Sequence, residues 1–348
     1  YQTCDGILYD LEECWKRLKN SGEIKQFPIA QKDFSNKLQI PEKLYGRAKE
    51  VTQIMKTFHS ATKGNAKVLL VSGRSGIGKS ALVGEIHKPI LEYRGYFIAG
   101  KYDQYKRNTP YRAIIQAFQN ILNQILTESS ESLARWKSRL ELALGNNGKV
   151  ITDIIPELEL LIGKQPVVPE LSPGDSQNRF ELVFQNFIHA LCDITHPIGI
   201  FLDDMQWADL PSINLIKSII LNPDSKYILV ILSYRDNEVN TTHPFQLAVE
   251  EIKKNGIEIK HILLNSLSLF DVNHLISDTL SCNKADTSDL AEVIHLKTGG
   301  NPFFVNEVFK NLYEQNLILA PNSKDETAKW SWDIEKIREV KLADNVIE

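Results

Sequence analysis

Residues 73–80 read Gly-Arg-Ser-Gly-Ile-Gly-Lys-Ser and match every fixed position of the phosphate-binding loop pattern G-x-x-x-x-G-K-[ST]. The glycines allow backbone angles that other residues avoid, so main-chain N–H groups can approach phosphate oxygens. In such a loop the lysine, Lys79, bridges the β- and γ-phosphates, and Ser80 is a ligand of Mg²⁺. The loop therefore predicts a nucleoside triphosphate ligand. The residues expected to contact it are Gly73, Arg74, Ser75, Gly76, Ile77, Gly78, Lys79, Ser80 and Ala81.

The sequence on both sides of the loop has the context that this motif requires. Residues 67–72 form a short, apolar, β-branched run that is typical of a strand in a parallel sheet. From Lys79 the apolar residues follow helical spacing, and Pro89 is expected to kink or end that helix. A strand, a loop and a helix in this order favour phosphate binding over a chance glycine-rich turn.

The rest of the chain alternates apolar runs with helical patterns. Helices are expected within residues 111–163 and over residues 180–191, where we interpret an aromatic stripe as core packing. This alternation predicts an α/β fold, a P-loop NTPase with a mostly parallel sheet flanked by helices. After about Ser266 helical spacing dominates, which predicts a helical lid subdomain. The further expected strands are residues 96–100, 198–202 and 227–232.

Composition excludes several classes of protein. The chain has 348 residues and a net charge of −4, which argues against a nucleic-acid or anionic-membrane surface. Its four cysteines are scattered without a C-x-x-C pair, which fits reduced thiols and offers no zinc site. No apolar run approaches the length of a membrane span. We therefore expect a cytoplasmic protein that binds neither nucleic acid nor membrane, and, because it begins with Tyr1, a fragment of a longer chain.

An acidic pair is expected to complete the site. Asp203 and Asp204 directly follow the strand expected over residues 198–202, and ligands bind at the carboxyl edge of such sheets. Asp203 is predicted to hold Mg²⁺ beside Ser80, and Asp204 to orient or deprotonate the attacking water. The alternative is that the two acids only cap the following turn.

Arginine is the natural residue to sense the γ-phosphate at the tip of a neighbouring strand. Arg235 follows the strand expected over residues 227–232 and is our candidate, with a surface salt bridge as the alternative. Arg107, Arg112 and Arg179 could reach phosphate or a partner, but we interpret them as solvated or structural. The catalytic candidates are Lys79, Asp204 and Arg235.

One motif would point to GTP rather than ATP. Residues 283–286 read Asn-Lys-Ala-Asp, the N-K-x-D pattern that reads guanine in GTPases, where it follows a buried strand. Here apolar residues at helical spacing precede it, and no D-x-x-G lies between it and the phosphate-binding loop. Guanine recognition is therefore not expected.

Four further segments occur in an order that is typical of one family. Residues 45–50 read as h-G-R-x-x-E, residues 202–209 as LDDxxWAD, residues 234–239 as a sensor segment and residues 298–304 as GGNPFF. Over about residues 41–316, the chain resembles the signal-transduction ATPases with numerous domains (STAND), a branch near the AAA ATPases.

The resemblance implies a regulatory switch in which ATP and Mg²⁺ lie between the core and the helical lid. It adds Gly46, Arg47 and Pro302 to the expected nucleotide contacts. Ala48 stands where the family usually has an acidic residue, which weakens the expectation for the contacts nearby. Slow ATP hydrolysis is expected if the module signals. The alternatives are a non-hydrolysing ATP-binding scaffold and a small-molecule kinase built on the same loop.

The two ends of the chain resemble parts of large bacterial Ser/Thr protein kinases that also carry sensor and histidine-kinase modules. The partners implied are these kinase and sensor domains of the same polypeptide, and nucleotide-dependent self-association is left open. The expected domains are residues 1–20, the last helix of a kinase domain; 21–45, a linker; 46–265, the P-loop ATPase core; 266–320, the helical lid; and 321–348, the truncated start of a helical or winged-helix part.

Overall fold

The computed structural model describes residues 4–29, 38–106, 109–321 and 329–340. The chain divides into two compact units. One is Arg47–Asn265, and the other combines Tyr1–Gly46 with Ser266–Glu348. Each unit is described by itself.

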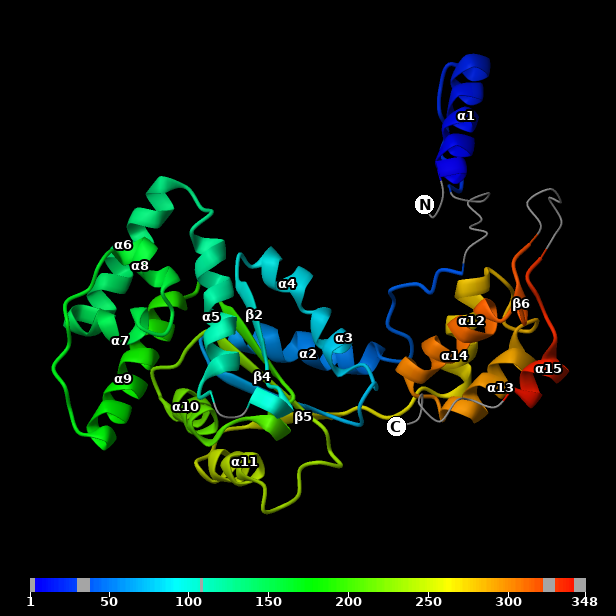
Figure 1. The fold of residues 1–348 in the computed structure, drawn as a ribbon. Helices are drawn as coiled ribbons and strands as arrows, with labels where there is room; N and C mark the ends of the chain where they lie inside the picture. The colour runs from blue at the N-terminus through cyan, green and yellow to red at the C-terminus, as the bar shows by residue number, and fades with distance from the viewer. Residues whose placement is uncertain (1–3, 30–37, 107–108, 322–328, 341–348) are drawn as a thin grey trace. The chain divides into compact units, whose positions relative to one another are not determined.

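A five-stranded sheet forms the centre of the first unit, with the order β2-β3-β4-β1-β5 (Figure 1). Every neighbouring pair of strands is parallel. Strands β3 and β4 are buried along their whole length, which explains why they read as continuous apolar runs. The predicted α/β class with a parallel sheet is confirmed. The strands are β1 Lys67–Ser72, β2 Tyr96–Lys101, β3 Ile198–Asp203, β4 Ile228–Tyr234 and β5 Ile259–Leu263.

Helices pack on both sides of this sheet and extend beyond it. The predicted aromatic stripe is core packing, since Phe184 and Phe187 of α9 are buried against Phe118 of α5, at ring distances of 5.3 and 5.6 Å. The helices of the unit are α2 Ala48–Ala61, α3 Lys79–Gly84, α4 His87–Glu92, α5 Arg112–Ile125, α6 Ser130–Leu144, α7 Gly148–Thr152, α8 Glu157–Ile162, α9 Pro173–Leu191, α10 Leu210–Leu221 and α11 Pro244–Lys254.

Two elements differ from the sequence-based expectation. The helix after the phosphate-binding loop ends at Gly84, before Pro89, which lies instead in the first turn of α4. Proline is tolerated there because the N–H groups of a first turn have no partner within the helix. Strand β5 was not predicted, because it is an edge strand in which Ile262 alone is buried.

The second unit is mainly helical after Ser266, as expected. Its apolar core includes Val272, Ile276, Ile294 and Phe309, all almost fully buried. Residues 283–286 lie in the turn between α12 and α13, so the N-K-x-D sequence does not follow a strand. The elements of the unit are α1 Cys4–Ser21, α12 Leu269–Leu280, α13 Ser288–Thr298, α14 Pro302–Glu314, β6 Ile318–Leu319, β7 Ser331–Trp332 and α15 Ile334–Glu339.

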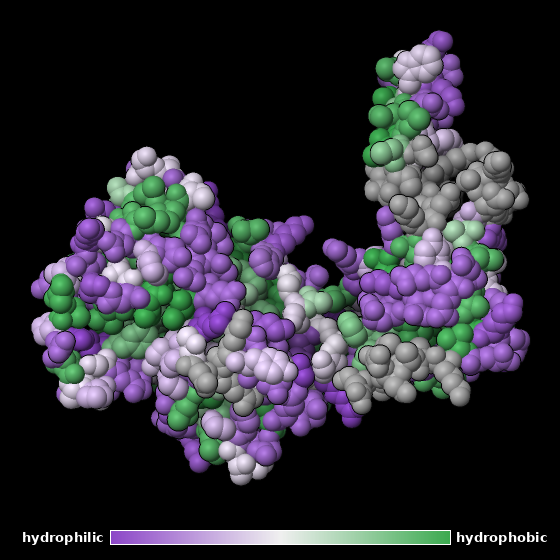
Figure 2. All heavy atoms as spheres, in the orientation of Figure 1, coloured by the Kyte–Doolittle hydropathy of each residue, from purple (hydrophilic) through white to green (hydrophobic). Residues whose placement is uncertain are grey.

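Helix α1 carries an apolar stripe along its surface (Figure 2). Leu8, Leu11, Trp15 and Leu18 are each at least half exposed. Their spacing of three and four residues places them on one face of the helix. Within the described ranges, no helix is both long and apolar enough for a bilayer span.

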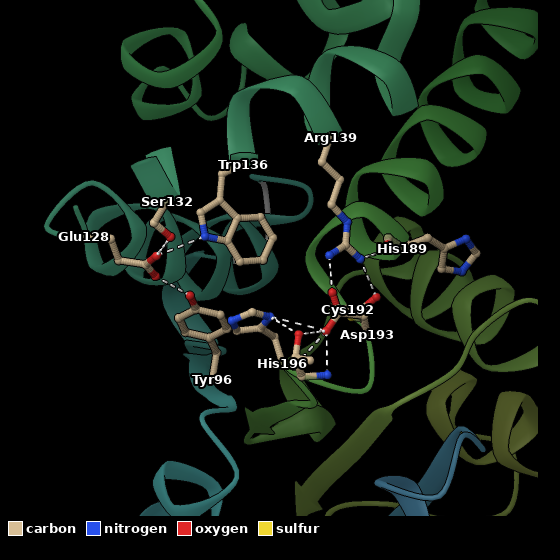
Figure 3. Close-up of polar contacts among 10 residues, drawn as sticks. Tyr96, Glu128, Ser132, Trp136, Arg139, His189, Cys192, Asp193 and His196 are labelled. Atoms are coloured by element: carbon tan, nitrogen blue, oxygen red, sulfur yellow. Dashed lines mark hydrogen bonds and ion pairs between the residues drawn. The ribbon is translucent and has the colours of Figure 1, made fainter. Parts of the chain in front are cut away.

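A polar network fastens α6 to the start of β2 (Figure 3). The carboxylate of Glu128 accepts hydrogen bonds from the Tyr96 hydroxyl at 2.5 Å, from the Trp136 indole N–H at 3.2 Å and from the Ser132 hydroxyl. Burial alone would raise the pKa of Glu128, but these hydrogen bonds outweigh it and lower the pKa. The network therefore favours a charged carboxylate that joins the helix to the sheet.

A second carboxylate joins α6 to the segment between α9 and β3. Arg139 forms an ion pair with Asp193 and donates to the Cys192 carbonyl at 2.8 Å, next to the C-terminus of α9. Asp193 also accepts from the main-chain N–H groups of Thr195 at 2.7 Å and His196 at 2.8 Å. Burial would raise the pKa of Asp193, but the bonds from Thr195 and Arg139 outweigh it and hold the pKa well below its usual range.

Because the pKa of Asp193 is lowered by folding, its charged form stabilises the fold at neutral pH. We expect Asp193→Asn to reduce the free energy of unfolding by about 1–2 kcal/mol at pH 7, a modest value because the side chain is about one-third exposed. The difference between the wild type and the variant should narrow as the pH falls below about 4 and the carboxylate becomes protonated. Urea denaturation at several pH values measures this.

Asp153→Asn is the matched control, since Asp153 is exposed and pairs with Lys149 of the same helical turn. Its cost should stay below about 0.5 kcal/mol. Equal costs for the two variants, or a difference that does not depend on pH, would contradict this role of Asp193.

Candidate functional site

The phosphate-binding loop connects β1 to α3, as the sequence predicts. Gly73, Gly76 and Gly78 all have positive φ angles, of 145°, 71° and 96°. At Gly73 space is also restricted, because a Cβ atom would lie 2.7 Å from the carbonyl oxygen of Leu264. Only glycine combines this φ angle with the absence of a Cβ atom, so the loop can pack closely against Leu264, the residue directly after β5.

Lys79 lies inside this loop, and its side chain is mostly buried. Its ammonium group donates to the main-chain carbonyls of Gly73 at 2.8 Å and Arg74 at 3.0 Å. Burial lowers the pKa of Lys79, and the nearby charges of Asp203 and Asp204 oppose this effect. The loop therefore holds a cation at its centre, while residues 74–76 are exposed.

The predicted metal ligands Ser80 and Asp203 lie next to each other. The Ser80 hydroxyl donates to the Asp203 carboxylate at 2.8 Å, across the sheet from the loop to the end of β3. The other carboxylate oxygen accepts from the Ser233 hydroxyl of β4 and from the main-chain N–H of Asp204 at 3.0 Å. A hydroxyl and a carboxylate are hard oxygen donors of the kind that Mg²⁺ prefers, so these residues fit the ion.

Asp204 is buried and has an unusual backbone, with a φ angle of 59°. Its carboxylate accepts from the Gln206 side-chain amide at 2.9 Å and pairs with the Lys101 ammonium at 3.1 Å. A left-handed backbone at a residue other than glycine costs free energy and is common at functional sites. The contacts with Gln206 and Lys101 hold the carboxylate at the carboxyl edge of the sheet.

Arg235 lies beside the Asp204 carboxylate and also forms an ion pair with Glu238. Its guanidinium lies 3.7 Å from Asp204, 2.7 Å from Glu238 and over the Trp207 ring at 4.7 Å. The ion pair with Glu238 is the salt bridge of the alternative reading, and the γ-phosphate sensor role of Arg235 stays a prediction. The main-chain N–H of Arg235 also donates to Gln206, at 3.1 Å.

Sequence reasoning missed three residues of this site. Lys101, Gln206 and Ser233 all contact one of the two acids. Lys101 is the last residue of β2 and is in register with Asp203, so the signal for it is the strand order rather than any motif.

The nucleotide contacts implied by the family resemblance are divided between the two units. Arg47 is buried, and its guanidinium donates to the carbonyls of Asn265 at 2.6 Å and of Ile77 in the loop at 3.4 Å. Gly46 and Pro302 belong to the other unit. There Gly46 has a φ angle of 66°, and Pro302 is the first residue of α14.

Comparison with known families matches residues 43–231 to the AAA ATPase domain. The match covers more than half of the chain, so this protein belongs to the AAA ATPase domain family. The region includes the phosphate-binding loop, the two acids at the end of β3 and most of β4.

The chain is similar to parts of two curated signalling proteins. It is 32% identical to Hybrid signal transduction histidine kinase G of Dictyostelium discoideum, over 94% of this chain and 11% of that protein. It is 22% identical to Histidine protein kinase 1 of Candida albicans, over 62% of this chain and 10% of that protein. The chain therefore spans about a tenth of the length of these relatives.

Two solved structures have a partly similar arrangement. Cdc6p from Pyrobaculum aerophilum has a TM-score of 0.47 and 13% identity, over 80% of this chain and 64% of that chain. A chain of the HORMA:CdnC:Trip13 complex of E. coli MS115-1 has a TM-score of 0.43 and 8% identity, over 85% of this chain and 87% of its own.

The geometry of the loop predicts unequal effects for two glycine substitutions. Gly73→Ala should lower the free energy of unfolding by about 3 kcal/mol, because it combines a strained φ angle with a clash against the Leu264 carbonyl. Gly78→Ala, where nothing lies within 4 Å of the added Cβ, should cost only about 1–2 kcal/mol. Urea denaturation without nucleotide compares the two. Equal costs would show that Leu264 does not restrict the loop.

Proposed function

We propose that this chain binds Mg²⁺-ATP at the phosphate-binding loop and hydrolyses it slowly, as a regulatory switch of a multidomain signal-transduction kinase. The observation that carries the proposal is the 2.8 Å hydrogen bond between Ser80 and Asp203, with Asp204 directly beside it. It brings the loop and the acidic strand end together in the arrangement that phosphoryl transfer requires.

Binding would depend mainly on the loop itself. Its main-chain N–H groups and the Lys79 ammonium would hold the phosphates. Lys79 donates to two loop carbonyls, and these contacts would keep its ammonium group within the loop, close to bound phosphate oxygens. ATP is proposed over GTP because of the family resemblance and because residues 283–286 lie in a turn between helices.

Ser80 and Asp203 would hold the magnesium ion, directly or through water. When bound, the ion neutralises charge on the β- and γ-phosphates. Ser233 and the N–H of Asp204 orient the Asp203 carboxylate through the opposite oxygen, which leaves one oxygen directed at Ser80.

Asp204 would orient or deprotonate the water that attacks the γ-phosphate. Arg235 would sense the γ-phosphate, since it already lies 3.7 Å from Asp204. Lys101 and Gln206 position Asp204 from two directions. These four side chains come from the ends of β2, β3 and β4 and the turn after β3, so a shift of any of these strand ends changes the site.

The switch would act through the connection to the helical unit. Arg47 contacts both the loop, at Ile77, and Asn265, the last residue before the helical unit begins again at Ser266. A change in the loop on hydrolysis would alter this pair of hydrogen bonds. We propose that Gly46, Arg47 and Pro302 complete the nucleotide site, with residues 266–320 as a STAND-type lid.

The proposed context is a large kinase of the kind that bacteria build with Ser/Thr kinase, ATPase and sensor modules. This chain spans only about a tenth of the length of the two histidine-kinase relatives, which supports the proposal of a multidomain parent protein. We propose that residues 1–20 are the last helix of a kinase domain, since the α1 stripe of Leu8, Leu11, Trp15 and Leu18 is exposed. Residues 21–45 would then be a linker and residues 321–348 the start of a further part, of which residues 30–37, 322–328 and 341–348 lie outside the described residues. We propose a cytoplasmic protein and leave nucleotide-dependent self-association open.

A non-hydrolysing ATP-binding scaffold is the second candidate function. The observation that favours it is that both carboxylate oxygens of Asp204 already have partners, Gln206 and Lys101. The two candidates differ only in turnover, so one pair of variants separates them.

Two substitutions test binding and turnover separately. Lys79→Ala should weaken ATP binding about 10- to 100-fold, because a charge-assisted contact to phosphate is lost. Asp204→Asn should leave binding within about threefold and lower single-turnover hydrolysis by about 10²- to 10⁴-fold. Calorimetry with a non-hydrolysable ATP analogue and rapid-quench assays measure these effects, with Asp153→Asn as the control.

Each failure has its own meaning. Unchanged ATP binding in Lys79→Ala would contradict the site as a whole. Tight ATP binding by the wild type, with no turnover in the wild type or in either variant, would favour the scaffold. Turnover that survives Asp204→Asn would remove Asp204 from the mechanism.

A further inference from the structure

A pocket of about 270 Å³ lies next to Lys101, the residue that pairs with Asp204. We propose that it binds a phosphate group, as free phosphate or as a phosphate ester, and that Lys101 is shared between this ligand and Asp204. The pocket is lined by different residues from the phosphate-binding loop. Only the effect of the ligand on hydrolysis rests on the proposed function.

The N-terminus of α5 supplies one set of donors. Arg112 and Ala113, the first two residues of this 14-residue helix, line the pocket. The preceding residue, Tyr111, has a left-handed backbone, and its side chain does not cap the helix. The first N–H groups of a helix have no partner within it and attract anions. At Gly100 a Cβ atom would lie 2.0 Å from the Ala113 carbonyl, so the helix end is fixed against β2.

A buried hydroxyl supplies an independent argument. Tyr102 lines the pocket and is 5% exposed, and its hydroxyl has no hydrogen-bond partner within the described part of the chain. The hydroxyl of Ser212 lies nearby, donates to Asp209 at 2.8 Å and accepts from the Tyr111 N–H at 3.2 Å. It retains one lone pair, but the Tyr102 hydroxyl does not reach hydrogen-bond geometry with it. Buried polar groups are rarely left unpaired, so the Tyr102 hydroxyl is a donor that a ligand can use.

The charged side chains around the pocket are balanced in sign, so it is the hydrogen-bond donors that favour an anion. Lys101 and Arg112 line it together with Asp103 and Asp209. The acids are already engaged: Asp209 accepts from the N–H and the hydroxyl of Ser212, and Asp103 accepts from a neighbouring main-chain N–H. Arg112, the Tyr102 hydroxyl and the helix N–H groups can donate to such a ligand, and Lys101 can do so when it turns from Asp204. A tetrahedral phosphate offers acceptors in all of these directions.

The volume indicates that more than a bare phosphate fits. Trp207 and Gln116 form further parts of the wall and offer an apolar surface and an amide to the remainder of an ester. Lys101 is 66% exposed and can turn from Asp204 toward the pocket. Asp204 would then keep Gln206 and Arg235 as its partners, so the ligand would change the surroundings of the proposed catalytic carboxylate.

Calorimetry on the whole 348-residue chain tests the site, with sodium phosphate and O-phosphoserine as the two probes. The titrations use the Lys79→Ala background, so that phosphate binding at the loop is weakened. Within that background, Arg112→Gln and Tyr102→Phe should each weaken binding of at least one probe about 10-fold, as expected for loss of a hydrogen bond to a charged group. Arg135→Gln, an equally simple change at an arginine on α6 that is 70% exposed, should leave binding unchanged.

The two probes distinguish the sources of the ligand. Tighter binding of sodium phosphate identifies the free ion, including the product of hydrolysis, and tighter binding of O-phosphoserine identifies an ester. Tyr102→Phe removes only an unpaired hydroxyl, so this variant should fold even if others do not. In the chain with an intact loop, a bound probe should change the rate of ATP turnover, and Lys101→Gln should remove that response.

Several results would overturn the proposal. Binding of neither probe in the Lys79→Ala background would contradict the pocket as a phosphate site, while the proposed function would stand. Binding that is unaffected by both Arg112→Gln and Tyr102→Phe would place the ligand elsewhere. Absence of ATP binding or of turnover in the wild type would instead contradict the proposed function, and the result for phosphate binding in the pocket would stand.

Discussion

The hydrogen bond between Ser80 and Asp203 is the contact on which the arrangement of the site depends. It joins the end of the phosphate-binding loop to the end of β3, although β4 lies between β1 and β3 in the sheet. Ser233 of β4 donates to the same carboxylate, so three neighbouring parallel strands meet at Asp203. The parallel order places all of these carboxyl ends on one edge, and a different order would separate the loop from the acids.

Asp204 has both an unusual backbone conformation and charged partners at the carboxyl edge of the sheet. Asp204 has a left-handed backbone, and its buried carboxylate lies between Lys101 of β2 and Arg235 after β4. A buried carboxylate requires partners, and partners that come from separate strands respond to movements of the sheet edge. The same arrangement holds Asp204 in position and restrains it, as the proposed slow switch would require.

Most of the residues at the centre of this site could be predicted, because they belong to short contiguous motifs. The loop, the buried run before it and the acids after β3 each carry a local signal, and the structure brings them together. Lys101 could not be predicted, because its partner lies 103 positions away and is set by strand order. Strand β5 was missed because an edge strand needs few apolar residues. The end of α3 was placed too late because the helix ends at Gly84 and not at the proline. The roles of Gly46 and Pro302 rest on family resemblance, since they lie in the other unit.

The most direct test of the account is a crystal structure of this chain with a non-hydrolysable ATP analogue and Mn²⁺ in place of Mg²⁺. The account predicts that the phosphates lie on residues 73–80 and that the anomalous signal of the metal lies between Ser80 and Asp203. A metal bound away from these two residues, or an analogue whose phosphates lie outside the loop, would contradict it.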